Sequence, residues 1–461
     1  MPVSDDTTHS SHYVSFDPDI CTGCSNCIKA CPTKAIRLSN ANPTCRELVA
    51  VEIYGINNAT YNSTCLMDKC IRCGECLRVC PTGAISTTTY ELEALQKDKV
   101  SIAIVSPVLY SQFKGVMPND ILHAVKKMGF DHAMDLSYYI EMFLYAADEY
   151  ITRNRTTGQS PWPLISPVCP VVIRLIAYQF PNLLPHIMPI MRPMSLLAKE
   201  ARAIIGREYK IKRDAVILYH ITPCPAKMVP SRSSFKQEHS LVDRTMGIKD
   251  VYAQITGQLK QMKKTGIEAL QEESEPKNIS GNCLLWGISG GEIAGISSDK
   301  TLAVSGLRET INYLEKIEMG LFKDVEYIEF RTCPEGCVGG ALNAVDKYIA
   351  KNTVLKTLRK LGLERLIPRD KVLLLYENEW ELSDITQDDF QRIFGVYKEH
   401  ISIKHLEEIE KILERIQGKD CAACGAPDCR TFAEDVVTGK AVLNDCIMFR
   451  KREIDITLEN K

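Results

Sequence analysis

The sequence predicts a mixed α/β protein whose central α/β segment is flanked by two small cysteine-rich segments. Between Val100 and Lys351, short apolar strands alternate with stretches of helical spacing, as in α/β folds. Closely spaced cysteines recur twice before residue 95, and four more follow residue 401. A chain of 461 residues is too long for one ordinary core, so we expect domains at 1–95, 96–351 and 401–461 with a connector at 352–400.

Composition limits the class of protein. Charged residues make up 25% and hydrophobic residues 45%, as in soluble globular proteins. The formal net charge of −2 argues against nucleic acid as the main partner. The longest apolar stretch, 168–194, contains Arg174, His186 and Arg192, so we expect no membrane span. The N-terminus lacks the basic and apolar regions of a signal peptide, which predicts a cytoplasmic protein.

Cysteine is unusually frequent, with 19 residues, of which 16 fall into clusters. Disulfides are rare in a reducing cytosol, so the clusters predict metal binding. The remaining three, Cys45, Cys65 and Cys283, have no assigned role.

Residues 1–95 contain two runs with the spacing C-x2-C-x2-C-x3-C, each followed by a proline. This pattern resembles that of bacterial ferredoxins with two 4Fe-4S clusters, in which the fourth cysteine of each run ligates the cluster of the other run. A zinc site would instead need two pairs with a longer spacer. The predicted ligand sets are Cys21, Cys24, Cys27 and Cys80 for one cluster and Cys70, Cys73, Cys76 and Cys31 for the other.

Three segments of the central region share the order apolar strand, turn, then Cys-Pro. They are PLISPVCP at 163–170, VILYHITPCPAK at 216–227 and RTCPEGCVGG at 331–340. Proline fits the first position of a helix, so each cysteine would lie between a strand's end and the next turn of helix. Open α/β sheets bind ligands outside these strand ends. The thiols expected to meet there form the ligand set of a 4Fe-4S cluster, namely Cys169, Cys224, Cys333 and Cys337.

Apolar periodicity places the other elements of the central region. It predicts helices at 120–128, 140–153, 170–179, 198–208 and 251–264. Strands are expected at 102–105, 284–288, 325–330 and 372–376. The GISGGE turn at 287–292 overlaps the end of the strand expected at 284–288, and it is either a plain loop or a wall of the cluster pocket.

The three Cys-Pro segments resemble the signature segments of FeFe hydrogenases. The resemblance implies an H-cluster, in which Cys169, Cys224 and Cys333 hold a 4Fe-4S cubane. Cys337 would hold the cubane as well and bridge it to a two-iron subcluster with CO and CN ligands. Lys227 would pair with a cyanide of that subcluster, a role that suits a compact ammonium.

Several positions depart from the pattern of the productive family members. Those members carry a second cysteine before the first ligand, where it relays protons; here that position is Val168, which has no exchangeable proton. Glu149 lies near the place of the next relay carboxylate, although it is equally well explained as a solvated helix residue. Thr222 and Arg331 stand where methionines are usual, and Met194 where a polar amide is usual. Such changes around a cluster should alter its potential and rate.

The C-terminal domain begins with an amphipathic helix predicted at 401–416. Its cysteines follow the spacing C-x2-C-x4-C-x16-C, which resembles the small four-cysteine 4Fe-4S domain of various redox and corrinoid proteins. Four thiolates also suit a structural zinc site, which stays open as an alternative. The four ligands would be Cys421, Cys424, Cys429 and Cys446.

Together the resemblances imply an iron hydrogenase that interconverts 2H⁺ + 2e⁻ and H₂ while 4Fe-4S clusters relay the electrons. The implied catalytic residues are Cys337, Lys227 and Glu149. The departures resemble the branches of the family assigned to hydrogen sensing with slow turnover, and the chain is similar to the branch without a PAS domain. Expected partners are H₂, protons and a ferredoxin-like or signalling protein, with a homodimer as a further expectation and with neither nucleic acid nor membrane.

Two alternatives remain open at this point. One is an ordinary ferredoxin-linked hydrogenase with another proton route, through His220, Glu335 or Cys283. The other is a hydrogenase-like iron–sulfur assembly protein that keeps the four cysteines but lacks the two-iron unit. In that case Lys227 would be an ordinary surface lysine.

Overall fold

The computed structural model describes residues 14–40, 61–65, 69–87, 92, 95–227, 242–265, 279–362, 365–378, 402–416 and 418–451. The chain divides into two compact units, and each is described by itself. One unit combines Met1–Thr88 with Val396–Lys461, and the other is Thr89–Gly395. Within the described part of the chain, no helix has both the length and the apolarity needed to cross a membrane.

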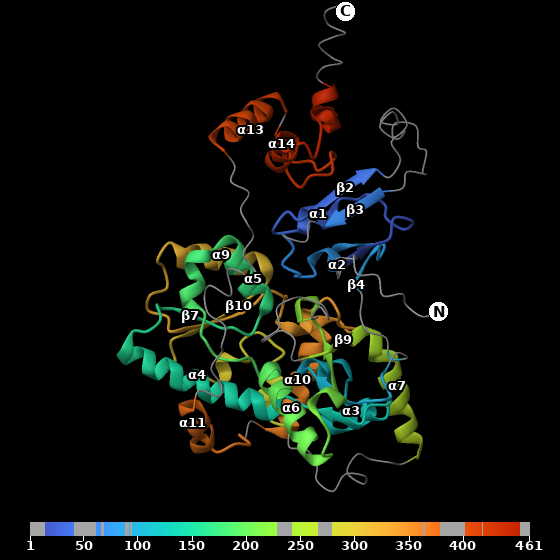
Figure 1. The fold of residues 1–461 in the computed structure, drawn as a ribbon, viewed down its shortest axis with the longest axis vertical. Helices are drawn as coiled ribbons and strands as arrows, with labels where there is room; N and C mark the ends of the chain where they lie inside the picture. Colours follow the sequence, from blue (N-terminus) through green and yellow to red (C-terminus); the bar gives the residue numbers. More distant parts are fainter. Residues whose placement is uncertain are drawn as a thin grey trace, which may run out of the picture. The chain divides into compact units, whose positions relative to one another are not determined.

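The N-terminal part of the first unit consists of two short antiparallel sheets and two short helices (Figure 1). Strand β1 (Val14–Phe16) pairs with β4 (Ile85–Thr87), and β2 (Ile36–Asn40) pairs with β3 (Tyr61–Cys65). Each cysteine run carries one helix, α1 (Asn26–Ala30) or α2 (Glu75–Val79). The preceding residue of each helix, Ser25 or Gly74, has a positive φ that turns the chain back over the thiols.

The C-terminal part of the first unit is helical. It contains α13 (Ile403–Arg415), α14 (Cys429–Val437) and the 3₁₀ turn η10 (Leu443–Asp445). Ser402 caps α13 by accepting a hydrogen bond from the backbone N–H of His405, and Asp428 caps α14 in the same way for Thr431. Helices this short need a shared core, and here it is formed around Ile416, Phe432 and Phe449.

The second unit contains two separate parallel sheets. The four-stranded sheet has the order β6-β5-β8-β9, and the three-stranded sheet has the order β10-β11-β7. The central strands β5 and β8 are mostly apolar and almost entirely buried, as expected of a parallel sheet covered by helices. The bounds are β5 Val100–Val105, β6 His132–Met134, β8 Val216–Thr222 and β9 Arg244–Gly247, then β7 Leu164–Ile165, β10 Thr301–Ser305 and β11 Tyr327–Arg331. The predicted mixed α/β class is thereby confirmed.

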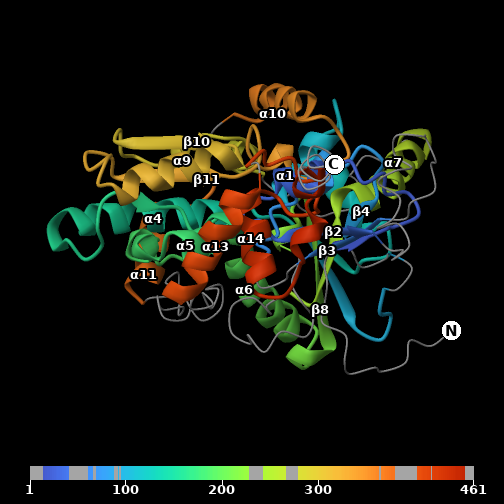
Figure 2. The ribbon, with the colours of Figure 1, turned by 90° about the horizontal axis from the view of Figure 1, so that it is seen from above.

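Helices of the second unit pack around these sheets. Figure 2 shows α9 lying beside β10 and β11, while α7 accompanies β9 at the other end of this unit. The bounds are α3 Pro118–Lys126, α4 Ser137–Thr157, α5 Pro170–Gln179, α6 Pro193–Glu208, α7 Ile248–Thr265, α8 Gly281–Leu285, α9 Leu307–Glu318, α10 Lys347–Leu361 and α11 Arg369–Glu377. The short 3₁₀ turns are η3 Pro107–Gln112, η4 Pro181–His186, η5 Arg213–Ala215, η6 Pro225–Lys227, η8 Ile293–Gly295 and η9 Cys337–Gly339. The five predicted helices of this region are present; α5 has the predicted ends, and the other four differ from the prediction at one or both ends.

Two predicted strands are wrong. The segment 284–288 belongs partly to helix α8, which Ser280 caps through the backbone N–H of Cys283. The segment 372–376 lies inside helix α11, which starts directly after Pro368. Apolar runs of about five residues do not distinguish a buried strand from a buried helix turn, so periodicity alone could not decide either case.

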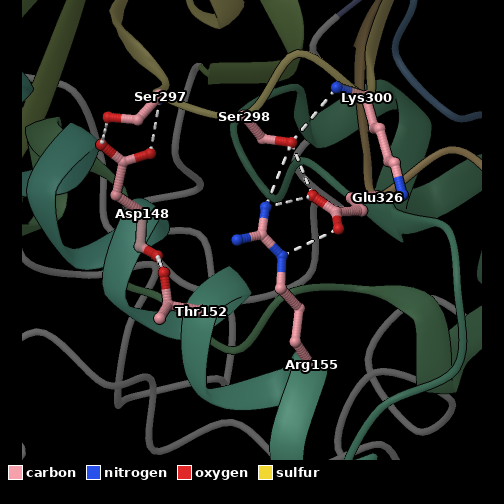
Figure 3. A network of polar contacts seen from close by, with 7 residues as sticks. All are labelled: Asp148, Thr152, Arg155, Ser297, Ser298, Lys300 and Glu326. Carbon is pink, nitrogen blue, oxygen red and sulfur yellow. Dashed lines mark hydrogen bonds and ion pairs between the residues drawn. The ribbon is translucent and has the colours of Figure 1, made fainter.

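A polar network connects helix α4 to the loop before β10 and to Glu326, the residue before β11 (Figure 3). The Asp148 carboxylate accepts hydrogen bonds from the Ser297 backbone N–H and hydroxyl, both at 2.7 Å. About two turns further along α4, Arg155 forms a two-pronged pair with Glu326 at 2.8 and 2.6 Å, and Ser298 donates to the same carboxylate. The hydrogen bond from Arg155 lowers the pKa of Glu326 despite its partial burial. Because Glu326 directly precedes β11, the network holds the strand that leads to Cys333.

Candidate metal centres

Four cysteines meet at one cavity in the second unit, as the sequence predicts. Each of the three loops follows the C-terminal end of a parallel strand, β7, β8 or β11. Strands β7 and β11 are neighbours in one sheet, whereas β8 belongs to the other, so the cavity joins the ends of two sheets. The residues that line it are Val168, Cys169, Pro170, Pro223, Cys224, Lys227, Arg331, Thr332, Cys333, Cys337 and Gly340.

The first two loops present their cysteines at the start of helical turns. Cys169 occupies the N-cap position of α5, and Pro170 is the first helical residue. Cys224 is followed by Pro225 and the 3₁₀ turn that ends at Lys227, whose N–H donates to the Cys224 carbonyl at 3.1 Å. The N-terminal end of a helix carries a partial positive charge, which favours the thiolate form of a nearby cysteine.

The third loop approaches other backbone so closely that only glycine fits at two positions. Gly336 has a φ of 93°, and a Cβ there would lie 2.5 Å from the Ser289 backbone nitrogen. A Cβ on Gly340 would lie 2.4 Å from the Pro223 carbonyl oxygen. A hydrogen bond supports the contact at Gly336, since the Ser289 N–H donates to the Glu335 carbonyl at 3.0 Å. The GISGGE turn therefore packs against the cysteine loop, although none of its residues is among those that line the cavity.

Burial makes the Cys224 thiol a poor acid on its own. Burial raises the pKa of Cys224 to about 11, and the nearby thiols of Cys169 and Cys337 add to the rise, while Lys227 opposes it. A metal ligand must be a thiolate, so a bound cationic metal centre would have to displace the proton. Four such thiols with an ammonium beside them form a donor set that fits an iron–sulfur centre.

A buried arginine completes the polar lining of the cavity. Arg331 is 1% exposed, and its Nη2 lies 2.5 Å from the Glu292 carboxylate, while its Nε lies 3.5 Å from Glu329. Tyr327 donates a hydrogen bond to Glu292, and the guanidinium carbon stands 5.4 Å from the centre of the Trp286 ring. Although burial lowers the pKa of Arg331, the two carboxylates outweigh this effect and keep the guanidinium charged.

The Arg331 side chain also shows that the cavity suits an anion. Its Nη1 is buried and has no hydrogen-bond partner among the residues that the structure describes. A buried N–H without a partner is costly, so a negatively charged occupant of the cavity would satisfy it. From the sequence, Arg331 stands out only as a departure from the family pattern. The local signal of a buried ion pair is that Glu329 and Arg331 lie two residues apart on a strand whose other residues are apolar or aromatic.

Of the positions considered for proton transfer, only the one occupied by Val168 lines this cavity. Val168 is 3% exposed and lies beside Cys169 in the lining. Glu149 instead pairs with Arg153 at 2.8 Å and lies 3.8 Å from Arg369. Its surroundings are those of a helix-surface ion pair, so a relay role for Glu149 stays a prediction.

The three residues of the alternative route lie in different places. His220 is buried in β8, where burial, together with Lys227 and Arg192, lowers its pKa to about 3 and keeps the ring neutral. Glu335 pairs with Lys351 at 2.5 Å. The third, Cys283, is buried, and its thiol donates a hydrogen bond to the Asp135 carboxylate at 3.4 Å.

Thr222 and Met194, the other two departures from the family pattern, lie in different surroundings. Thr222 is fully buried, and its hydroxyl accepts a hydrogen bond from the Cys224 N–H at 3.3 Å. Met194 lies in the first turn of α6 and packs against the main core. Of the unassigned thiols, Cys65 ends strand β3, and Cys45 lies outside the described residues.

In the first unit Cys31 lies near thiols of the second cysteine run, while its role as a ligand of that run's cluster stays a prediction. Burial raises the pKa of Cys76 to about 12, and the neighbouring thiols that add to the rise include Cys70 and Cys31. Burial likewise raises the pKa of Cys73, with Cys31 the largest contribution from another thiol. Cys31 thus lies with the second run, as in a two-cluster ferredoxin. The matching position of Cys80 with the first run stays a prediction.

The four C-terminal cysteines of the first unit line one small pocket. Their positions come from the loop before α14, the first residue of α14 and the turn after it, namely Cys421, Cys424, Cys429 and Cys446. Among the described residues, no three His, Cys, Asp or Glu side chains are arranged to hold a single metal ion. Thiols spread around a pocket suit a body of several irons, because each ligand then binds a different iron.

Comparisons with protein families agree with these sites. Residues 20–85 match the model of a 4Fe-4S dicluster domain, and residues 416–448 match a family described as "Putative Fe-S cluster". The chain is therefore an iron–sulfur protein. Residues 99–301 match the C-terminal domain of the iron only hydrogenase large subunit, a segment that includes Cys169, Cys224 and Lys227 but ends before Cys333. The chain is thus hydrogenase-large-subunit-like, with a 4Fe-4S ferredoxin domain before this segment and an Fe-S domain after it.

Individual relatives are distant. The chain is 23% identical over 383 residues to the periplasmic Fe hydrogenase large subunit of Nitratidesulfovibrio vulgaris, covering 71% of this chain and 86% of the relative. It is 23% identical over 215 residues to iron hydrogenase 1 of Clostridium pasteurianum, covering 45% of this chain and 36% of that one. A solved FeFe-hydrogenase from Chlamydomonas reinhardtii is 15% identical, with a TM-score of 0.45 over 65% of this chain and 95% of its own. The cytoplasmic location stays a prediction, since the first of these relatives is named as periplasmic.

We predict that Gly340→Ala damages the central site. The added Cβ would meet the Pro223 carbonyl oxygen, and crowding of this kind costs about 1–3 kcal/mol. Iron bound per chain and the melting temperature should both fall. The matched control is Gly257→Ala in α7, where a Cβ meets nothing within 4 Å and should be neutral or slightly stabilising. Equal iron content in both variants would contradict the close approach.

We also predict that Arg331→Met destabilises the second unit by about 3–5 kcal/mol, because Glu292 and Glu329 are left buried without a counterion. Denaturant unfolding of the cluster-free protein measures this loss. Burial raises the pKa of Glu329. When Glu329 is protonated it carries no charge, so the loss of the Arg331 counterion then costs less stability. The deficit should be largest above that raised pKa and shrink as the pH falls toward the ordinary carboxyl value.

The control for this variant is Arg153→Met, whose side chain is 48% exposed. An exposed ion pair contributes below about 1 kcal/mol, so this change should be mild at every pH. The buried network would be contradicted if both variants lost a similar amount of unfolding free energy. It would also be contradicted if the loss in Arg331→Met did not depend on pH.

Proposed function

We propose that the chain is an FeFe hydrogenase of slow turnover that interconverts 2H⁺ + 2e⁻ and H₂ in a sensing or regulatory role. The observation that carries this proposal is the meeting of four cysteines from three strand ends around one cavity, with Lys227 and Arg331 in its lining. A four-thiol set of this kind, together with two cations, suits an anionic metal assembly larger than one ion.

In this proposal each lining residue has a defined part. Cys169, Cys224 and Cys333 hold a 4Fe-4S cubane, and Cys337 holds the cubane and bridges to the two-iron subcluster. Lys227 donates hydrogen bonds to a cyanide ligand. When bound, the H-cluster supplies the centre at which protons and electrons combine, and the protein supplies orientation and electrostatics.

The Val168 side chain supports the slow and sensory part of the proposal. It is buried in the cavity lining directly before Cys169, and it can neither donate nor accept a proton. General acid–base transfer by a positioned side chain contributes about 10²–10⁴ in rate, so a site without one should turn over slowly. A ferredoxin-like or signalling protein is the proposed electron partner, and the cytoplasm is the proposed location.

Infrared spectroscopy after maturation tests the two-iron subcluster. The wild-type protein should show bands of bound carbonyl and cyanide, and Cys337→Ser should lose them because the bridging thiolate is gone. The matched control is Cys283→Ser, which alters a buried thiol outside the cavity lining and should keep the bands. Full bands and activity in Cys337→Ser would refute the bridging role. A wild-type protein without bands would favour the assembly-protein alternative.

Hydrogen production tests the cause of slow turnover. Val168→Cys places a thiol beside Cys169 and should raise the rate by about tenfold or more if the missing proton donor limits it. Val168→Ala controls for repacking of the lining and should leave the rate low. An unchanged rate in Val168→Cys, with its infrared bands intact, would count against this explanation and favour another proton route.

A further inference from the structure

The C-terminal helical segment joins the N-terminal ferredoxin module in one compact unit, although the whole second unit separates them in the sequence. Two ion pairs connect the two segments. Lys34 Nζ lies 2.7 Å from Asp428 Oδ2. Arg37 Nε lies 2.5 Å from Asp435 Oδ2, and its Nη2 lies 3.2 Å from Oδ1. Both cations lie in the ferredoxin module, and both carboxylates lie in the C-terminal segment.

The pair between Arg37 and Asp435 differs from an ordinary surface ion pair. The two side chains are only 15% and 13% exposed, and the contact is two-pronged. Arg37 also donates from Nη1 to the carbonyls of Lys34 and Ile36 at 2.6 and 3.2 Å, which fixes the plane of the guanidinium. A partly buried pair is screened less by salt than an exposed one, so it can hold two segments together in the cell.

The second pair connects the two cysteine loops directly. Lys34 follows Cys31 by three residues, and the next backbone N–H, that of Ala35, donates to the Cys31 sulfur at 3.2 Å. On the other side, Asp428 caps α14 and immediately precedes Cys429, the first residue of that helix. The ion pair therefore brings a ligand loop of the ferredoxin module next to a ligand loop of the C-terminal pocket.

We propose that the C-terminal cluster exchanges electrons directly with the ferredoxin-module cluster held by Cys31, Cys70, Cys73 and Cys76, across an interface fixed by these two ion pairs. In each transfer, one electron leaves a reduced 4Fe-4S cluster and enters an oxidised one, and no bond or proton changes place. The C-terminal cluster then shares an electron path with the ferredoxin module. This inference rests on the cluster content proposed above, but not on the two-iron subcluster.

The test measures the magnetic coupling of the two clusters in the whole protein reduced with dithionite. Each reduced 4Fe-4S cluster carries an unpaired spin, and neighbouring spins split or broaden each other's electron paramagnetic resonance signals. The wild-type protein should show this coupling. Arg37→Glu should lose the coupling that involves the C-terminal cluster, because two like charges would face each other, while the two ferredoxin-module clusters still couple to each other. Arg37→Glu combined with Asp435→Arg should restore the lost coupling.

Two further variants make the result specific. Asp435→Asn removes the charge with little change of shape and should weaken the coupling if the full reversal fails to fold. Glu410→Gln breaks the exposed pair with Arg430 inside the C-terminal segment and should leave the coupling unchanged.

Iron and acid-labile sulfide analysis separates the outcomes. The proposal would be overturned if the coupling of the C-terminal cluster persisted in Arg37→Glu with all clusters present. It would also be overturned if the wild-type protein, with all clusters reduced, showed no coupling of the C-terminal cluster. Zinc in place of iron at the C-terminal cysteines would overturn both this proposal and the proposed cluster content. Loss of the infrared bands alone would affect only the proposed hydrogenase reaction.

Discussion

The central site depends on a close approach of backbone to backbone. The loop that carries Cys333 and Cys337 packs without side chains against the Pro223 carbonyl and the Ser289 nitrogen, and this contact is what lets thiols from two different sheets share one cavity. Parallel strands bring loop ends to one edge, but they do not by themselves bring two sheets together. The glycines at 336 and 340 and the hydrogen bonds around them provide that last step.

Charge is distributed around this cavity in a consistent way. Arg331 presents a permanent cation to the thiols, and the carboxylates of Glu292 and Glu329 behind it offset its desolvation. Lys227 adds a second cation on the same cavity, while Val168 contributes only an apolar surface. The lining is therefore suited to holding an anionic centre.

The order of the chain and its order in space differ in the first unit. The last segment of the sequence returns to the first, and opposite charges that are hundreds of residues apart meet beside cysteine loops. Such a contact costs loop-closure entropy that grows only slowly with the length of the intervening chain. A small domain can thus be added at the C-terminus and still work beside the N-terminal module.

Spacing along the chain by itself determined the cysteine motifs of the two small domains, because most cysteines of a motif lie within a few residues of the next one, and it determined the strand-turn-cysteine order of the central loops. It also indicated the mixed α/β class through apolar periodicity. It could not distinguish strand from helix at 284–288 or 372–376, since a short buried run looks the same in both. Only the tertiary structure decided that Glu149 lies in a surface ion pair, that Arg331 is buried with two carboxylates, and that Arg37 meets Asp435. These outcomes depend on long-range packing, in which the partner of a charge is set by the fold and leaves no local pattern in the sequence.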